Sequence, residues 1–254
     1  MNFQEEVTKY RKRDTAAAIG VYVLFMAWAA LAVVFSEYDV NQRQAISLIG
    51  AAVLTALVFG VVLLKKQGLR SIGLHGERLG KAAVLGLIFA VIPIIINIAL
   101  PPILYEDMQL APIMRSLWLF FYFFVMAAYE DIFFVGFLQT RLYGVFRTDR
   151  LAIGVGAAMF AFVHVPIALL SGISLGAELL MYLVGVFFMH QALVLIFRRY
   201  FSLVAVTLAH TIINWSYTSL WIWGGENYSF FWASVAGLVF VVAVNVWGWW
   251  ISRK

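Results

Sequence analysis

The sequence predicts an all-α integral membrane protein, an eight-transmembrane-helix bundle with both termini in the cytoplasm. Of its 254 residues, 64% are hydrophobic and only 12% are charged, whereas soluble domains are about half apolar and a quarter charged. Apolar stretches long enough to cross a bilayer recur along the chain, and the basic residues gather in alternate connections. Together these observations indicate a multi-pass protein of the cell membrane.

The apolar stretches are expected to be helices because a lone segment in lipid must satisfy its backbone hydrogen bonds internally. Their predicted ranges are 15–36, 45–64, 82–100, 116–143, 151–170, 177–197, 202–223 and 229–251. The connections between them are short, so residues 1–254 are predicted to form a single domain. The absence of cysteine excludes a thiol nucleophile or thiol ligand.

The basic residues give the predicted orientation. Sixteen of the 18 Lys and Arg residues lie in the two tails and in the connections after the second, fourth and sixth stretches, and only Arg43 and Arg115 lie on the other side. The positive-inside rule then places both termini in the cytoplasm. The protein has a net charge of +5, and this distribution of its basic residues indicates contact with a lipid bilayer and not with nucleic acid. The longest cytoplasmic connection, 65–81, is predicted to lie on anionic lipid.

A few polar residues lie inside the predicted spans. Glu130 and Asp131 stand together in the fourth span, where an acid at the bilayer centre costs about 2.5–3.5 kcal/mol. At 1.5 Å per residue, Glu130 and His164 lie roughly 20 Å from the cytoplasmic end of their helices, Asn214 roughly 18 Å and His210 roughly 12 Å. This agreement in depth predicts a polar site within the membrane. His190, without a polar companion, is interpreted as structural.

These residue types in one pocket indicate peptide hydrolysis. A carboxylate beside a histidine, here Glu130 with His164, can hold and deprotonate water. His210 and Asn214, four residues apart on one helix face, can donate hydrogen bonds to a developing oxyanion. Alternatively, Glu130, His164 and His210 are the ligand types of a divalent metal such as zinc. No His-Glu-x-x-His helix enforces zinc, so both alternatives remain open.

The chain resembles the CAAX protease and bacteriocin-processing (CPBP/Abi) family, which includes the type II CAAX-prenyl endopeptidases. The resemblance covers residues 116–217, and Gly185 matches a family glycine between the second and last motifs. The family motifs Glu-Glu-x-x-x-Arg with Gly-Phe-Leu-Gln, Phe-x-x-x-His and His-x-x-x-Asn/Asp correspond in order to 130–139, 160–164 and 210–214.

The resemblance implies an intramembrane endopeptidase, of metallo- or glutamate type, that hydrolyses a peptide bond of a membrane-associated substrate, prenylated or not. It assigns Glu130 and His164 to water activation and His210 with Asn214 to the oxyanion site. Two supporting residues, Asp131 and Phe160, complete the set.

Two departures from the motif keep a second interpretation open. The second glutamate of the motif is Asp131, and its arginine is Val135. Loss of supporting groups commonly lowers activity. The alternative is therefore a catalytically impaired family member that acts as a bacteriocin-immunity or membrane scaffold and binding protein. A proton-relay transporter ranks third, because the sequence has no visible inverted repeat.

Overall fold

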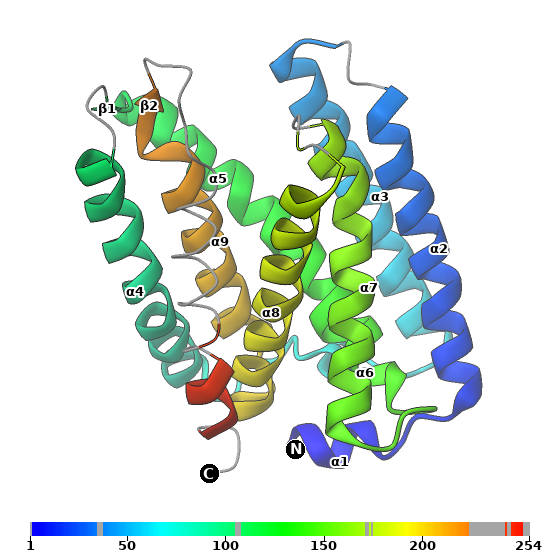
Figure 1. Cartoon of the computed structure of the whole chain (residues 1–254). Helices are drawn as coiled ribbons and strands as arrows, with labels where there is room; N and C mark the ends of the chain where they lie inside the picture. The colour runs from blue at the N-terminus through cyan, green and yellow to red at the C-terminus, as the bar shows by residue number, and fades with distance from the viewer. Residues whose placement is uncertain are drawn as a thin grey trace.

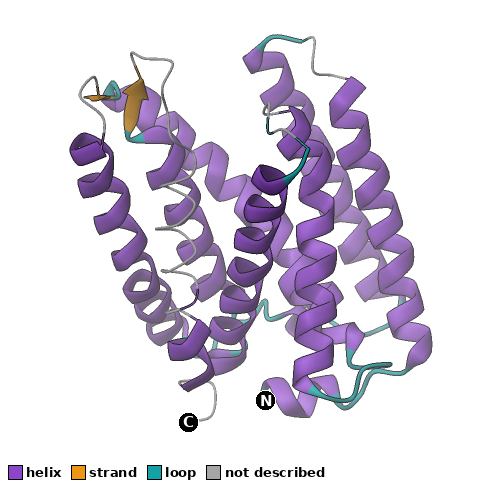
Figure 2. Cartoon of the chain, viewed as in Figure 1, coloured by secondary structure: helices purple, strands orange, loops and turns teal. Residues whose placement is uncertain are grey.

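The computed structural model describes residues 2–34, 38–104, 108–170, 173, 175–223, 242 and 245–250. They form a bundle of long helices with a small sheet at one end and the short helix α1 at the other (Figures 1 and 2). The helices are α1 Phe3–Val7, α2 Lys12–Val34, α3 Val40–Leu64, η2 Leu69–Ile72, α4 Leu79–Leu104, α5 Ile113–Glu130, η3 Asp131–Leu138, α6 Gln139–Leu142, α7 Asp149–Leu170, α8 Ala177–Tyr200 and α9 Leu203–Ser219, and the strands are β1 Met108–Leu110 and β2 Trp221–Trp223.

The helices follow the predicted spans closely. Six segments in the described part of the chain are long and apolar enough to cross a membrane. Five of them are the single helices α2, α3, α4, α7 and α8, and the sixth is the continuous run formed by α5, η3 and α6. They correspond in order to the first six predicted stretches, and α9 is a shorter apolar helix at the seventh. The eighth predicted stretch, 229–251, lies outside the described residues except for 242 and 245–250. The multi-pass architecture is thus supported, and the total of eight stays a prediction.

The predicted end of the seventh span is wrong. Helix α9 stops at Ser219, and residues Trp221–Trp223 form strand β2 instead. This strand pairs antiparallel with β1, so that Gln109 faces Ile222. Aromatic residues favour strands, and the Trp221 indole N–H donates to the Asn97 carbonyl oxygen at 2.8 Å. The sheet therefore ties the end of α9 to the connection between α4 and α5.

Helix α9 is packed against both α4 and α5, α7 runs along α8, and α2 runs along α7. The contact of α4 with α9 is unusually close at Gly86. A Cβ atom added there would lie 2.3 Å from the Ala205 carbonyl oxygen, so only a residue without a side chain lets the two backbones approach this far. The packing fixes the position of α9, which carries His210 and Asn214.

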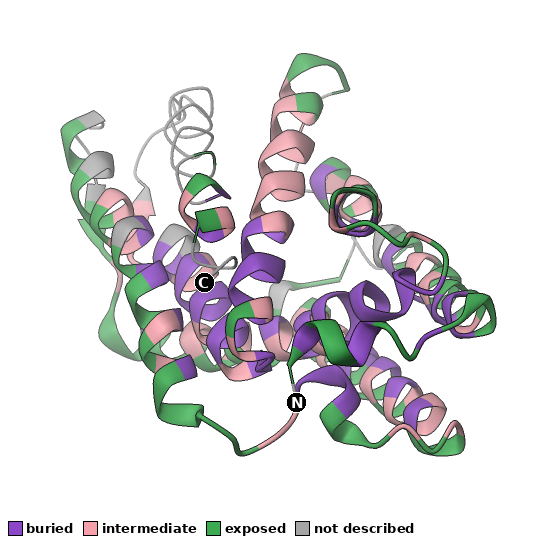
Figure 3. Ribbon diagram, turned by 90° about the horizontal axis from the view of Figure 1, so that it is seen from below, coloured by how far each residue is buried: buried purple, intermediate pink, exposed green. Residues whose placement is uncertain are grey.

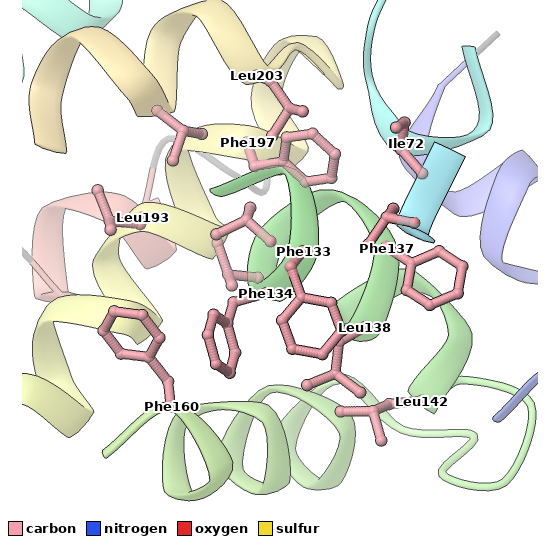
Figure 4. Packing of buried hydrophobic residues seen from close by; sticks show 14 of the residues in the cluster. Ile72, Phe133, Phe134, Phe137, Leu138, Leu142, Phe160, Leu193, Phe197 and Leu203 are labelled. Carbon is pink, nitrogen blue, oxygen red and sulfur yellow. The ribbon is translucent and has the colours of Figure 1, made fainter. Parts of the chain in front are cut away.

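The apolar core is centred on η3 and α6, within the span that carries Glu130 and Asp131. Figure 4 shows that side chains of η3 and α6 pack against residues from α7, α8, α9 and η2. The cluster includes Phe133, Phe134, Phe137, Leu138, Leu142, Phe160, Leu193, Phe197, Leu203 and Ile72. Seen along the bundle, buried residues gather at the centre and exposed residues face outward (Figure 3). The segment after the acidic pair is therefore held on all sides by other elements.

The connection between α3 and α4, which the sequence predicts to lie on anionic lipid, packs partly into the bundle. Its middle forms the 3₁₀ helix η2, in which Ser71 and Ile72 are buried, while Arg70 stays exposed and pairs with Glu77 at 2.6 Å. Ile72 belongs to the same apolar core as η3. Burial of this apolar residue, with the polar contacts of Ser71, draws the connection into the bundle.

Candidate functional site

The two acids stand at the point where the helix changes its winding. The α-helix α5 ends at Glu130, and the next eight residues, Asp131–Leu138, form the π-helix η3. The Gln139 N–H donates to the Phe134 carbonyl oxygen, five residues earlier, as a π-helix requires. Short π-helical segments occur frequently at functional sites. Adjacent carboxylates thus project from a segment of uncommon backbone geometry.

His210 of α9 lies between these two acids. Its Nδ1 is 3.0 Å from Asp131 Oδ1, and its Nε2 is 3.8 Å from Glu130 Oε2. The Asp131 side chain is 1% exposed, and the Glu130 side chain is 14% exposed. The structure therefore brings together three of the predicted site residues from two separate spans, with Asp131 sealed in and Glu130 at the accessible edge.

The contact with Asp131 determines where His210 carries a proton. A carboxylate oxygen accepts hydrogen bonds, so at 3.0 Å the Nδ1 of His210 is the donor. Nε2 then faces Glu130 either as a lone pair or as a second N–H. At 3.8 Å the two atoms are not hydrogen-bonded, but they are close enough for a proton on either one to favour this approach. The site can therefore hold a proton at this position.

His164 of α7 is oriented by its own helix. Its Nδ1 lies 2.8 Å from the carbonyl oxygen of Phe160, one turn earlier. Since a carbonyl oxygen only accepts, Nδ1 carries the proton, and in the neutral ring this leaves a lone pair on Nε2. The ring is partly buried. His164 thus presents a basic nitrogen.

Phe160 is the common neighbour of three imidazoles. Its ring centroid is 4.6 Å from that of His164 and 6.3 Å from that of His210. On α8, His190 stacks on the same ring at 4.8 Å with an interplanar angle of 24°. Phe160 therefore contacts all three histidine rings, and its supporting role stays a prediction.

His190 lies closer to the site than the sequence indicated. Its side chain is fully buried, and neither ring nitrogen has a hydrogen-bond partner among the described residues. A signal was available, because His190 lies at a depth of about 10 Å, close to that of His210. Its lack of a polar companion argued the other way, and the structure agrees that its contacts are aromatic.

Asn214 follows His210 by one helical turn on α9 and is partly exposed. Residues four apart lie on the same face of an α-helix, so Asn214 continues the face from which His210 reaches the acids. Its part in the chemistry remains a prediction.

The candidate metal ligands do not form a cluster. The described part of the chain contains no group of three or more His, Cys, Asp or Glu side chains arranged to hold a metal ion. Two of the candidates, His210 and Glu130, are neighbours, while the Nδ1 of His164 is engaged by a backbone carbonyl. Metal binding by Glu130, His164 and His210 therefore stays a prediction from the sequence.

The position of the missing motif arginine is apolar. Val135 is 1% exposed and belongs to the hydrophobic core. Asp131, about one turn earlier, is bonded to His210. The carboxylate that the motif would place near an arginine therefore finds an ionisable partner on another helix.

A protein family matches part of the chain. Neither the curated proteins nor the solved structures gave a match. Residues 112–216 match the family described as type II CAAX prenyl endopeptidase Rce1-like. This segment contains every candidate site residue. The predicted resemblance is thus confirmed over residues 112–216, and this part of the chain is similar to the type II CAAX prenyl endopeptidase Rce1-like family.

Proposed function

We propose that this protein is an intramembrane endopeptidase that hydrolyses a peptide bond of a membrane-associated substrate. The observation that carries the proposal is the contact of His210 with both Asp131 and Glu130 inside the predicted membrane region. Such a cluster is costly in lipid and is retained chiefly where it acts on a ligand or a proton. The family match of residues 112–216 supports protease chemistry for this cluster.

The proposed reaction begins with a water molecule held by Glu130 and the free Nε2 of His164. Glu130 takes one proton as the water oxygen bonds to the carbonyl carbon of the substrate. The electron pair of the carbonyl bond moves to its oxygen, and this oxyanion is stabilised by hydrogen bonds from His210 Nε2–H and the amide of Asn214. When the intermediate collapses, the C–N bond breaks and the leaving nitrogen takes the proton from Glu130.

In this scheme Asp131 positions His210 and does not touch the substrate. Its contact with Nδ1 fixes the ring so that Nε2 points toward Glu130. A ring protonated at both nitrogens would donate to Asp131 on one side and to the oxyanion on the other.

The test is cleavage of membrane-presented peptides, prenylated and unprenylated, by the purified protein in lipid. Glu130→Gln and His164→Ala are each expected to lower the rate by about a thousandfold, because the first removes the group that takes the water proton and the second removes a group that holds the water. Glu178→Gln, at the start of α8, is the matched control and should retain the wild-type rate. Equal rates for wild type and Glu130→Gln would contradict the proposal.

A second candidate, a binding or immunity protein without turnover, is favoured by the apolar surroundings of Val135. It predicts that the wild-type protein binds such peptides without cleaving them. Under this alternative, Glu130→Gln would change neither the amount of bound peptide nor its length.

A further inference from the structure

Arg141 is a buried cation at the far end of the π-helix from the acidic pair. It is 1% exposed, and charged side chains are seldom buried so completely without partners. Its Nη1 donates to the Ser71 carbonyl at 3.2 Å, the Gly136 carbonyl at 3.3 Å and Thr140 Oγ1 at 2.7 Å. Its Nη2 donates to Gln67 Oε1 at 2.7 Å and Ser71 Oγ at 2.8 Å. One guanidinium group thus joins the α3–α4 connection to η3 and α6.

The same side chain contacts the N-terminal segment. The guanidinium carbon lies 4.5 Å from the ring centre of Tyr10 and 4.6 Å from that of Phe137, a geometry that is favourable for a cation on an aromatic face. The Tyr10 hydroxyl donates to the buried Glu6 at 2.6 Å. Burial raises the pKa of Tyr10 above its usual range, so the hydroxyl keeps its proton. The chain before α2 is therefore the third segment held at Arg141.

These contacts satisfy the carbonyl groups at the end of the π-helix. Where a π-helix gives way to an α-helix, the backbone hydrogen bonds change register and carbonyls must find other donors. The Gly136 carbonyl accepts from the Thr140 hydroxyl at 2.6 Å as well as from Arg141. The Phe137 carbonyl accepts from Thr140 at 3.0 Å. Arg141 and Thr140 thus supply donors at the end of η3.

The connection also touches the π-helix directly. A Cβ atom placed on Gly136 would lie 2.6 Å from the Ile72 carbonyl oxygen, so η2 rests against the backbone of η3. Ser71, the neighbour of Ile72, holds Arg141 through both its carbonyl and its hydroxyl. A displacement of the connection would therefore act on η3 through adjacent contacts.

We propose that Arg141 is a positioning residue that fixes the winding of η3 and so sets Glu130 and Asp131 against His210. The hydrogen-bonded ring of a π-helix spans more residues than that of an α-helix, so each residue turns the chain through a smaller angle. Rewinding of Asp131–Leu138 into an α-helix would rotate the acids relative to α6, which is anchored by Arg141. The proposal goes beyond the proposed function, because it concerns the backbone that carries the site.

The direct test is hydrogen exchange of the full-length protein in lipid without substrate. In Arg141→Met, exchange is expected to rise by about tenfold in 131–138 and 69–73, with little change in the buried part of α8, 192–197. Arg141→Lys should show a smaller rise, because an ammonium group lacks the planar fork of donors. Arg198→Met is the matched control. The Arg198 side chain is 9% exposed and also contacts an acid, Asp149, and an aromatic ring, that of Phe3, and its loss should leave exchange in 131–138 unchanged.

A uniform rise across 131–138 and 192–197 would show that Arg141 only stabilises the fold, and unchanged exchange in 131–138 would remove its link to η3. Either result overturns the proposal. If Arg141→Met fails to fold, Gln67→Ala decides the question, because it removes one acceptor of the guanidinium and leaves the others. A rise of hydrogen exchange in 131–138 and 69–73 of Gln67→Ala then supports the proposal, and unchanged exchange there overturns it.

A kinetic measurement adds a readout that a purely structural role would not change. Where the wild-type protein cleaves a peptide, Arg141→Lys should lower kcat by about tenfold with KM within about twofold, because the misplaced acids act on the transition state and contribute little to substrate binding. A change in KM alone would contradict positioning. If the wild-type protein cleaves no peptide, the proposed function fails, while the exchange experiment still tests Arg141.

Discussion

At the scale of single residues, the Asp131 carboxylate binds the His210 ring at the nitrogen opposite the one that faces Glu130. Asp131→Asn keeps the size of the side chain but allows the amide to donate, which reverses the preferred proton position on the ring. We expect kcat to fall by about 10²- to 10³-fold, the usual cost of a misoriented oxyanion donor. Steady-state cleavage kinetics measure this.

Asp131→Glu is the matched control, because it keeps the carboxylate and introduces the acid of the family motif. It should retain most of the activity. Full activity of Asp131→Asn would mean that the carboxylate does not orient His210 during the reaction.

Replacement of His190 is expected to stabilise the protein without lowering its activity. The buried ring nitrogens of His190 have no hydrogen-bond partner in the described part of the chain. A buried polar group without a hydrogen bond costs about 1–3 kcal/mol. His190→Phe keeps a ring to stack on Phe160 and removes that cost, so we expect a higher Tm and unchanged cleavage. Thermal unfolding in detergent measures the gain.

His190→Gln keeps polar atoms at the same position and should show no such gain in Tm. A loss of cleavage in His190→Phe as large as in His164→Ala would instead place His190 in the chemistry.

At the scale of elements, the sequence predicted where the helices lie but not how one of them winds. Hydrophobicity is a local property, so it predicts a single helix over 116–143, and the structure has one continuous span over 113–142. Its change to a π-helix at Asp131 depends on contacts of Gly136 with Ile72 and of Arg141 with Ser71. The partners of these contacts are distant in the sequence, so local patterns do not predict them.

The site residues could be found from the sequence because ionisable groups are costly in lipid and stand out there. The contacts of each site residue could not be found in the same way. The pairing of Glu130 with His164 stays a prediction, and the sequence did not indicate that Glu130 lies near His210 or that His164 bonds to the Phe160 carbonyl. Pairing depends on how each helix is rotated about its axis, and that rotation follows from packing over its whole length.

The approach of α4 to α9 tests this dependence on packing. Gly86→Ala would place a methyl group 2.3 Å from the Ala205 carbonyl oxygen, and because that atom is backbone, the two helices must move apart. We expect a destabilisation of about 1–3 kcal/mol, as for overpacking in general, together with lower cleavage because α9 carries His210. Thermal unfolding and kinetics measure the two effects.

Gly60→Ala in α3 is the matched control, since a Cβ atom there meets nothing within 4 Å. Alanine in an open helical position should be neutral or slightly stabilising. If Gly86→Ala proves as harmless as Gly60→Ala, the close approach of the two helices does not position α9.

At the scale of the whole molecule, the two ends of the bundle differ in their polar contacts. Ion pairs gather at the end that carries α1, where Lys65 bonds to Asp14 at 3.0 Å and Arg198 to Asp149 at 2.8 Å. The opposite end carries the small sheet of β1 and β2 (Figure 1). The excess of basic residues at the α1 end predicts that this end faces the cytoplasm.

Because the chain has no cysteine, this orientation can be tested with single introduced thiols. Arg147, before α7, and Gln109, on β1, are both exposed and lie in connections at opposite ends. In intact cells an impermeant maleimide should label Gln109→Cys at once and Arg147→Cys only after the membrane is opened, while the unmodified chain stays unlabelled. The reverse pattern would invert the predicted topology. It would also place the Arg141 contacts on the outer side, where their neighbouring basic residues would contradict the positive-inside rule.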